Sequence, residues 1–414
     1  MPGDRVGRNI GRKENMQITF QPLICAFQIQ AGLYLKDLVQ NMDVITEKKF
    51  GFGCMRLPMK GAEVDYDEFN RMIDYFMESG FRYFDTAHGY LEEKSETAIR
   101  DCLVKRYPRD SYLLADKLTE NYFQKQEDIL PFFELQLERT GVEYFDYYLH
   151  HAMTAEYYQK FETCNAFEIV KELRRKGKIR HIGMSFHDKA EVLEKILKEH
   201  PEIEVVQLQF NYADYDAPEI ESYKCYRVCV KYGKPIIVME PLKGGGLVDL
   251  PGEAKEIFDV LNAGSYASYA IRFCASFPRV EMVLSGMNNM EDMRDNIGYM
   301  KEFIPLSNEE YDAVEKVREI LKKQDTIPCT ACRYCVEGCP KNIAIPDLFA
   351  CYNAKKRYKD WNSDFYYGVH TGKNGKASDC IGCSRCEHVC PQHLPIREYL
   401  KEISEIFENG NQAI

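Results

Sequence analysis

Short apolar runs alternate with longer amphipathic runs between Lys49 and about Phe303. The short runs have the length and the β-branched or aromatic content of buried strands. They are FGFGCMRL (50–57), FRYFD (81–85), YLLADK (112–117), FDYYLH (145–150), IRHIGMS (179–185), EVVQLQF (204–210), KPIIVME (234–240) and VEMVLSG (280–286). Helical patterns such as residues 68–79 and 189–200 separate most of them.

Eight units of strand followed by helix predict an α/β fold, a closed (β/α)8 TIM barrel with a parallel sheet. A doubly wound open sheet is the alternative. That fold usually carries a phosphate-binding G-x-G-x-x-G motif after an early strand, and this sequence has none there.

The segment after the barrel begins with a different kind of pattern. LSNEEYDAVEKVREILKKQ, from Leu306, combines a Ser-x-x-Glu capping sequence with helical periodicity, which predicts a closing helix. The composition then changes sharply, because nine of the sixteen cysteines lie from Cys329 onward. We therefore expect an N-terminal extension (1–48), a barrel (49–305), a closing helix and linker (306–327), and a cysteine-rich domain with a C-terminal helix (328–414).

Residues 16–35, MQITFQPLICAFQIQAGLYL, carry no charge and follow a basic segment, which is the outline of a signal or membrane anchor. Four glutamines interrupt the apolar run, and each side-chain amide would be costly in hydrocarbon. No cleavage pattern of small residues is clear. The sequence therefore favours an additional N-terminal segment and no membrane partner.

The net charge of -11 argues against nucleic acid or an anionic membrane as the main partner, because both would repel this surface. Small molecules or basic proteins fit better. Sixteen cysteines in a long chain without a convincing secretory signal indicate a reducing compartment, by default the cytoplasm. There, clustered thiols more often hold metal than form disulfides.

Eight cysteines form two runs with the same spacing, C-x2-C-x2-C-x3-C-P. The runs are Cys329, Cys332, Cys335 and Cys339 before Pro340, and Cys380, Cys383, Cys386 and Cys390 before Pro391. Thiolates two residues apart can wrap a tight loop around one face of an iron–sulfur cube. Zinc is the alternative, but its thiolate ligands usually come as separated C-x2-C pairs.

The two runs resemble the bacterial two-cluster ferredoxin domain over about residues 328–395. In that pattern the fourth cysteine of each run ligates the other cluster. We therefore predict an α+β ferredoxin-like domain with two [4Fe-4S] clusters. One would be held by Cys329, Cys332, Cys335 and Cys390, and the other by Cys380, Cys383, Cys386 and Cys339. A long insert at residues 341–379, which contains the only tryptophan, departs from the pattern, and we expect it to cover or dock the clusters.

Four polar side chains end or follow the predicted barrel strands, at the end where such barrels place their active sites. They are Asp85, Tyr90, Lys117 and His151. Each has an ordinary structural explanation alone, but together they form a proton-donating set. A buried lysine ammonium would lower the pKa of the phenol, and the aspartate would hold that lysine charged. The phenol could then protonate a carbonyl oxygen, which the histidine would orient.

With these residues, the barrel resembles the aldo/keto reductase family over about residues 50–303. The segment FDTA…Y…SE, the strand-ending lysine and the D-x-Y-L-x-H signature match that family. The resemblance implies a catalytic tetrad at Asp85, Tyr90, Lys117 and His151. The signature leaves one residue between Leu149 and the histidine, so it selects His151 rather than His150.

The resemblance also implies contacts to a nicotinamide cofactor, NAD or NADP. Ser185 and Gln207 would hold the carboxamide, and Met239 replaces an aromatic ring that often stacks on the nicotinamide. The remaining positions are Pro241, Leu242 and Gly244 in the pyrophosphate loop PLKGGG, and Ser285, Gly286, Asp292 and Asn296 at the adenosine end. Gly286 and Asp292 replace basic residues often used for the 2′-phosphate, which makes NAD credible.

The two halves imply different electron chemistry, because the family moves a hydride whereas clusters move single electrons. A flavin usually connects the two, and the sequence indicates no flavin site. We expect an NAD(P)-dependent oxidoreductase acting on a small carbonyl or alcohol substrate, with clusters that exchange electrons with a redox protein or flavoprotein. The alternatives are a carbonyl reductase with structural or redox-sensing clusters, and a non-catalytic electron-transfer module.

Overall fold

The computed structural model describes residues 48–217, 220–323, 326–327, 329, 331, 333–390 and 392–409, all within the unit Thr46–Ile414. Residues 1–47 of the predicted N-terminal extension lie outside the described residues. Eight parallel strands close into a barrel in the order β1, β10, β9, β8, β7, β6, β5, β4. They are β1 (Phe50–Gly53), β4 (Tyr83–Asp85), β5 (Leu113–Leu118), β6 (Phe145–Met153), β7 (Ile179–Phe186), β8 (Val205–Gln209), β9 (Ile236–Met239) and β10 (Val280–Ser285). The eight predicted strands and the barrel are confirmed.

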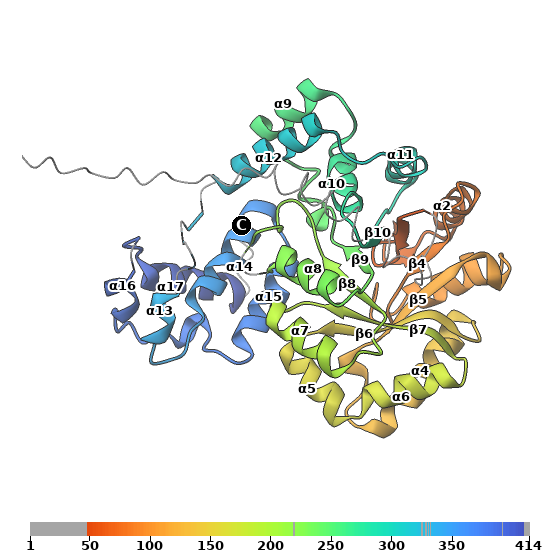
Figure 1. The fold of residues 1–414 in the computed structure, drawn as a ribbon, viewed down its shortest axis with the longest axis horizontal. Helices are drawn as coiled ribbons and strands as arrows, with labels where there is room; N and C mark the ends of the chain where they lie inside the picture. Colours follow the sequence, from red (N-terminus) through yellow and green to blue (C-terminus); the bar gives the residue numbers. More distant parts are fainter. Residues whose placement is uncertain are drawn as a thin grey trace, which may run out of the picture. The chain divides into compact units, whose positions relative to one another are not determined.

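The strands are apolar because helices cover the sheet from outside and side chains fill it from inside. All residues of β4 and β8 are buried. Figure 1 shows the strands surrounded by the helices that follow them in the chain. An unpredicted hairpin, β2 (Met59–Lys60) and β3 (Glu63–Val64), lies between β1 and the first barrel helix.

The barrel helices bury one face each. Helix α2 illustrates the pattern, since Phe69, Met72, Ile73 and Phe76 recur at helical spacing and are all buried, while Asp65 caps its first turn. The others are α3 (Ser95–Ile99), α4 (Gln126–Thr140), α5 (Ala155–Thr163), α6 (Ala166–Arg175), α7 (Ala190–Glu199), α8 (Ser222–Lys231), α9 (Gly252–Leu261), α10 (Tyr266–Ala275) and α11 (Met290–Met300). Helix α2 spans Tyr66–Glu78.

The predicted closing helix is α12 (Asn308–Lys322), and its Ser307–Glu310 capping box is formed. The same glutamate accepts from Arg272 of α10, with an Nη1–Oε1 distance of 2.5 Å and an Nη2–Oε2 distance of 3.0 Å. Both side chains are buried, so the cap also anchors α12 to the barrel.

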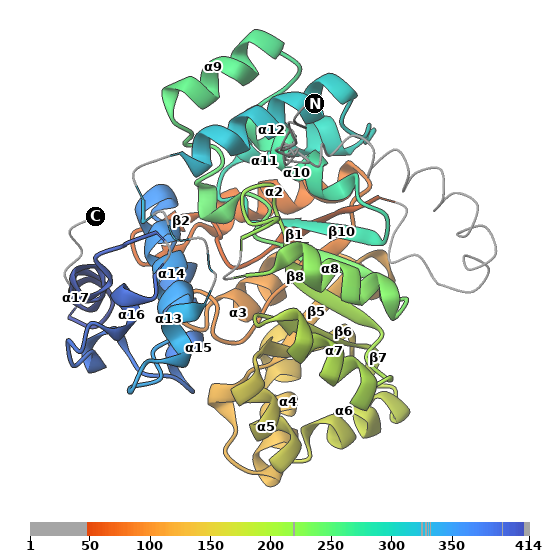
Figure 2. The ribbon, with the colours of Figure 1, turned by 60° about the vertical axis from the view of Figure 1, so that its left-hand side comes forward.

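The cysteine-rich domain is mainly helical in the residues described. It contains α13 (Tyr334–Glu337), α14 (Ile345–Tyr358), α15 (Asn362–Thr371), α16 (Arg385–His388) and α17 (Ile396–Phe407). Figure 2 shows α13, α14, α16 and α17 in blue as one group of helices. The β part of the predicted α+β domain is limited, among these residues, to one parallel bridge between Ile343 and Gly375. The domain core forms around Leu348, Phe349 and Leu400.

Candidate functional site

A cavity of about 830 Å³ opens at the carboxyl ends of the barrel strands. Its wall includes all ten residues predicted to contact the nicotinamide cofactor and three of the four predicted catalytic residues, Asp85, Tyr90 and His151. The fold therefore brings together positions that span more than 200 residues of sequence. Lys117, the fourth predicted catalytic residue, is buried behind this wall and does not line the cavity.

The Lys117 ammonium is fully buried and has three oxygen partners. Its Nζ lies 2.6 Å from Asp85 Oδ1, 2.7 Å from the Thr86 carbonyl oxygen and 3.2 Å from the Tyr90 hydroxyl. Gln207 donates from Nε2 to the other Asp85 oxygen at 3.0 Å. A continuous chain of charged and polar groups thus runs from Gln207 through Asp85 and Lys117 to the phenol on the cavity wall.

Burial and charge act in opposite directions on this chain of groups. Burial alone would lower the pKa of Lys117, but the Asp85 carboxylate and Tyr90 raise it above its ordinary value, so Lys117 stays charged. Burial raises the pKa of Tyr90 more than Lys117 lowers it. Lys117 acts in the predicted direction, but the net pKa of Tyr90 lies above its ordinary value because removing the phenolate from water costs more than the ammonium compensates. Tyr90 therefore carries its proton at neutral pH.

His151 faces the same cavity. Its Nδ1 lies 2.6 Å from the Thr119 hydroxyl oxygen, and its ring meets the Tyr90 ring edge to face with centroids 6.0 Å apart. Burial, together with the charge of Lys117, holds the His151 pKa well below its ordinary value, so the ring is neutral. If Thr119 donates to Nδ1, the remaining proton sits on Nε2, which can then donate to a ligand.

The neighbouring histidine has a structural environment instead. His150 is buried, its Nδ1 pairs with the Gly183 carbonyl oxygen at 3.1 Å, and its ring stacks on Phe167. It is not among the residues that line the cavity. The structure therefore places His151, and not His150, beside Tyr90.

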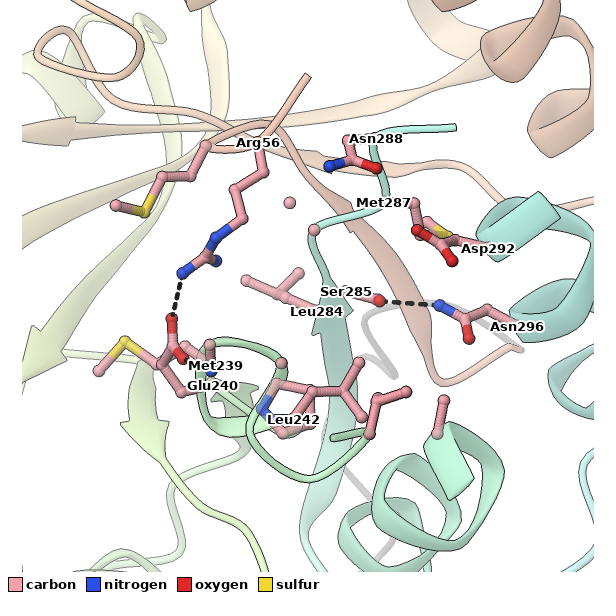
Figure 3. Close-up of a pocket in the computed structure, with 18 of the residues that line it drawn as sticks. Arg56, Met239, Glu240, Leu242, Leu284, Ser285, Met287, Asn288, Asp292 and Asn296 are labelled. Atoms are coloured by element: carbon pink, nitrogen blue, oxygen red, sulfur yellow. Dashed lines mark hydrogen bonds and ion pairs between the residues drawn. The ribbon is translucent and has the colours of Figure 1, made fainter. Parts of the chain in front are cut away.

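The loop after β9 has strained backbone where it borders the cavity. Glu240 and Lys243 adopt positive φ angles of 54° and 49°, and Gly244 and Gly245 have φ of 65° and 102°. The Glu240 carboxylate stabilises this turn by accepting from the Gly244 amide at 2.6 Å. It also pairs with Arg56 at 3.4 Å, as Figure 3 shows. Sequence reasoning missed Arg56, although it follows the first strand, where barrel sites are built.

The opposite part of the wall is formed by β10 and α11. Asn296 donates from Nδ2 to Ser285 Oγ at 2.9 Å (Figure 3). Tyr299 donates to the other Asn296 atom, Oδ1. Three exposed carboxylates, Asp259, Asp292 and Asp295, line the cavity here. Arg56 is the only lysine or arginine along the described wall. This part of the cavity therefore has an acidic edge.

The insert between the two cysteine runs also reaches this cavity, which the sequence did not indicate. Trp361, Asn362 and Phe365 belong to its wall. Tyr366 donates to Gln209 Oε1 of β8 at 3.1 Å, and its hydroxyl lies 3.3 Å from the His187 ring nitrogen. The insert therefore packs against the barrel in addition to forming part of the core of the cluster domain.

The cysteines line two small pockets of the C-terminal domain. Cys329, Cys335 and Cys390 line one of them, together with Phe349 and Leu394. The other is lined by Cys339, Cys380, Cys383 and Cys386. Cys332 lies outside the described residues. The fourth cysteine of each run thus faces the pocket of the other run, which is the crossed arrangement that we predicted.

The surroundings of the sulfurs suit iron–sulfur clusters. The Ala331 amide donates to Cys329 Sγ and the Ile343 amide to Cys339 Sγ, both at 3.4 Å. Such N–H groups stabilise the negative charge of cluster ligands. The described thiols of the two runs line two separate pockets.

Residues 49–319 match the model of the aldo/keto reductase family, which covers more than half of the chain. The chain belongs to the aldo/keto reductase family. Residues 328–395 match the 4Fe-4S dicluster domain, so this aldo/keto reductase carries a C-terminal domain for two [4Fe-4S] clusters. Both family resemblances seen in the sequence are confirmed.

Individual relatives are distant. The chain is 33% identical to an aldo-keto reductase of Mycolicibacterium smegmatis over 33% of its own length and 44% of that protein. It is 25% identical to an uncharacterized oxidoreductase of Bacillus subtilis over 60% of its length and 85% of that protein. The chain thus spans less than half of the mycobacterial relative.

Solved structures support the fold. An aldo-keto reductase from Klebsiella pneumoniae in complex with NADPH superposes with a TM-score of 0.54 at 21% identity, covering 65% of this chain and 90% of that one. An aldo-keto reductase from Bacillus halodurans in its holo form gives 0.54 at 23% identity, covering 65% and 91%. Among the described residues, no helix has both the length and the apolar character needed to cross a membrane.

Proposed function

We propose that this aldo/keto reductase reduces a small carbonyl compound to an alcohol with a nicotinamide dinucleotide. The observation that carries the proposal is the Asp85–Lys117–Tyr90 chain, which presents a protonated phenol to the cavity. The cavity also has room for a dinucleotide along a wall of glycine loops, amides and hydroxyls. Ser185 Oγ, which accepts from the Ala152 amide at 2.7 Å, keeps its own proton for a ligand.

Each of the four tetrad residues has its own part in the proposed reaction. A bound nicotinamide would supply the hydride that adds to the carbonyl carbon. Tyr90 donates its proton to the carbonyl oxygen, so that the C=O double bond becomes C–H and O–H. Lys117 stabilises the phenolate that remains, Asp85 keeps Lys117 charged and in place, and neutral His151 orients the carbonyl by donating a hydrogen bond.

We propose NAD rather than NADP as the preferred cofactor. If the adenosine end lies at β10 and α11, a 2′-phosphate would approach Asp292 and Asp295 without a lysine or arginine of the described wall beside it. Carboxylates repel a phosphate and do not repel the 2′-hydroxyl of NAD. The acidic edge supports this preference.

We further propose that the clusters exchange single electrons with a redox protein or flavoprotein, in the cytoplasm. Cys383 is exposed, so the cluster held with Cys380 and Cys386 would lie near the surface. A structural or redox-sensing role is the second candidate. It is favoured by the position of Cys335 and Cys386 in the hydrophobic core of the domain, where cluster ligation would contribute folding energy.

The test uses anaerobically purified protein with intact clusters. NADH oxidation is followed at 340 nm with a panel of small aldehydes and ketones, and NADPH serves as the comparison. We expect carbonyl-dependent oxidation, faster with NADH. If no carbonyl compound accelerates the oxidation of either cofactor, the proposed reductase activity is wrong.

Cluster absorbance is recorded in the same samples without a carbonyl compound. Bleaching by NADH without added flavin would show that barrel and clusters are coupled inside the chain. Bleaching only with an added flavoprotein would support an external electron partner, and unchanged absorbance in both cases would favour the structural or sensing role.

A further inference from the structure

The insert between the two cysteine runs is joined to the β9 loop by a buried ion pair. Lys243, in that loop, is fully buried, and its Nζ lies 2.6 Å from Asp214 Oδ1 and 3.0 Å from Asp360 Oδ2. Asp214 belongs to the barrel, whereas Asp360 immediately precedes Trp361 in the insert. Asp214 alone can balance the Lys243 charge, so the contact with Asp360 serves to join the loop to the insert. Asp360 therefore holds the strained loop to the cluster domain.

Asp214 is itself firmly positioned. Gln209 and Asn211 donate to its Oδ2, each at 2.7 Å, so one carboxylate oxygen serves these amides and the other serves Lys243. The loop that starts at Glu240 is thus supported by the barrel on one side and by the insert on the other. Its positive φ angles at Lys243 and Gly244 are maintained by these contacts.

A second contact joins the insert to Arg56. The guanidinium carbon lies 5.7 Å from the centre of the Trp361 ring, in the range of a cation–π interaction. Trp361 also borders the loop, because a Cβ added at Gly244 would lie 3.4 Å from its ring. Both side chains are partly exposed to the cavity, at 44% for Trp361 and 35% for the Arg56 side chain.

Arg56 bridges two glycine positions that face each other across the cavity. A Cβ at Gly244 would lie 3.9 Å from Arg56 Nη2, and a Cβ at Gly286 would lie 3.6 Å from Nη1. A guanidinium presents several N–H donors in a plane and binds phosphate oxygens in a bidentate manner. Since Arg56 is the only lysine or arginine on the described wall, an anionic ligand in this cavity has one obvious cationic partner.

We propose that the cluster domain completes the dinucleotide site of the barrel. In this proposal Arg56 is the clamp that binds the cofactor diphosphate. Trp361 positions the Arg56 guanidinium, and Asp360 fixes the loop after β9. This inference rests on the proposed use of a nicotinamide dinucleotide. Before the ligand binds, Glu240 balances the Arg56 charge. When the diphosphate binds, it takes the place of Glu240 on the guanidinium, and the Glu240 carboxylate keeps its bond to the Gly244 amide.

The neighbouring Asn362 supports a ligand-facing role for this part of the insert. Its side chain is buried to 3% exposure on the cavity wall, and its Nδ2 has no hydrogen-bond partner among the described residues. A buried donor without a partner is costly, and an acceptor on a bound ligand would remove that cost.

The test measures binding by isothermal titration calorimetry, with anaerobic protein that retains its clusters. The probes are NADH, ADP-ribose, which keeps the diphosphate, and adenosine, which lacks it. Arg56→Gln should weaken NADH and ADP-ribose by about 10- to 100-fold and leave adenosine unchanged. Trp361→Ala should weaken the same two ligands by about 3- to 10-fold, and Trp361→Phe should restore most of the affinity.

Asp360→Asn tests the loop contact and should also weaken NADH and ADP-ribose selectively. The matched control is Asp364→Asn, which removes an exposed carboxylate of the same segment that pairs with Lys355 outside the cavity wall. Iron content and circular dichroism verify that each variant is folded. Asp364→Asn should bind all three probes as the parent does.

The outcomes separate this inference from the function on which it rests. If the parent binds NADH but Arg56→Gln and Trp361→Ala bind it equally well, the clamp is wrong and the nicotinamide-dependent function stands. Equal losses for adenosine and ADP-ribose would also overturn the clamp, because the effect would not concern the diphosphate. If the parent does not bind NADH, and a further titration with NADPH also shows no binding, the proposed function itself fails.

Discussion

The barrel and the cluster domain build their reactive sites in opposite ways. Asp85, Tyr90, Lys117 and His151 come from three different strands and the loop after one of them, and a closed sheet is needed to bring them together. The cysteines of each run lie within a few residues of one another, so spacing alone gathers three of the four ligands. Only the cysteine that each pocket receives from the other run requires the domain to fold.

This difference extends to the chemistry. In the barrel, the Lys117 ammonium has no exposed surface and lies beside the Tyr90 phenol, the proton donor of the proposed reaction. The cluster domain exposes Cys383 near its surface, where single electrons can enter or leave. Burial of Lys117 fixes the geometry for proton transfer from Tyr90, whereas a cluster close to the surface is suited to electron exchange with a partner. The insert that carries Trp361 is where the two kinds of site meet.

The largest effect should follow removal of the Tyr90 hydroxyl. We expect Tyr90→Phe to lower carbonyl reduction by about 10²- to 10⁴-fold, since the reaction loses its proton donor. NADH affinity and iron content should be unchanged. The matched control is Tyr232→Phe, which removes a hydroxyl that pairs with Glu194 outside the cavity. Steady-state kinetics would contradict the assignment if both variants kept the parent rate.

Lys117→Met should act on the pH dependence. Alcohol oxidation needs the Tyr90 phenolate, so below the raised Tyr90 pKa its rate should increase about tenfold per pH unit. Removing Lys117 raises that pKa further, and at each pH the oxidation rate should fall by about 10- to 1000-fold with the same slope. Initial rates from pH 6 to 10 test this. An unchanged profile would mean that Lys117 does not act on the phenol.

Paired cysteine variants test the crossed arrangement. Cys390→Ser should reduce the iron content from about eight to about four atoms per chain. Adding Cys329→Ser should cause no further loss, because both residues serve the same cluster. Adding Cys380→Ser instead should remove nearly all iron, since that residue serves the other cluster. The reverse pattern of iron loss would establish clusters confined to single runs.

The smallest effect concerns cofactor choice. Asp292→Asn should improve kcat/KM for NADPH relative to NADH by up to about 5-fold, because it removes one exposed carboxylate from the acidic edge and salt screens such charges. Asp249→Asn is the control, as its exposed carboxylate is outside the cavity wall. A parent enzyme that already prefers NADPH would contradict the NAD assignment.

Much of the candidate site could be predicted because its residues carry local signals. The tetrad positions lie near the carboxyl end of a strand or in the loop that follows it, and the repeated cysteine spacing has few other uses. The net pKa of Tyr90 could not be predicted in this way, since its direction depends on how burial competes with Lys117. Arg56 also escaped prediction, because its importance depends on Gly244 and Gly286 lying on either side of it.

The sequence by itself determined the barrel, through eight buried apolar runs, and the cluster domain, through two thiol runs whose spacing matches an iron–sulfur cube. Only the tertiary structure decided that the insert between those runs becomes part of the barrel cavity. The contacts of Asp360 with Lys243 and of Trp361 with Arg56 join residues that are more than 100 positions apart. Periodicity and spacing record local geometry, whereas such contacts depend on how two separately recognisable domains pack.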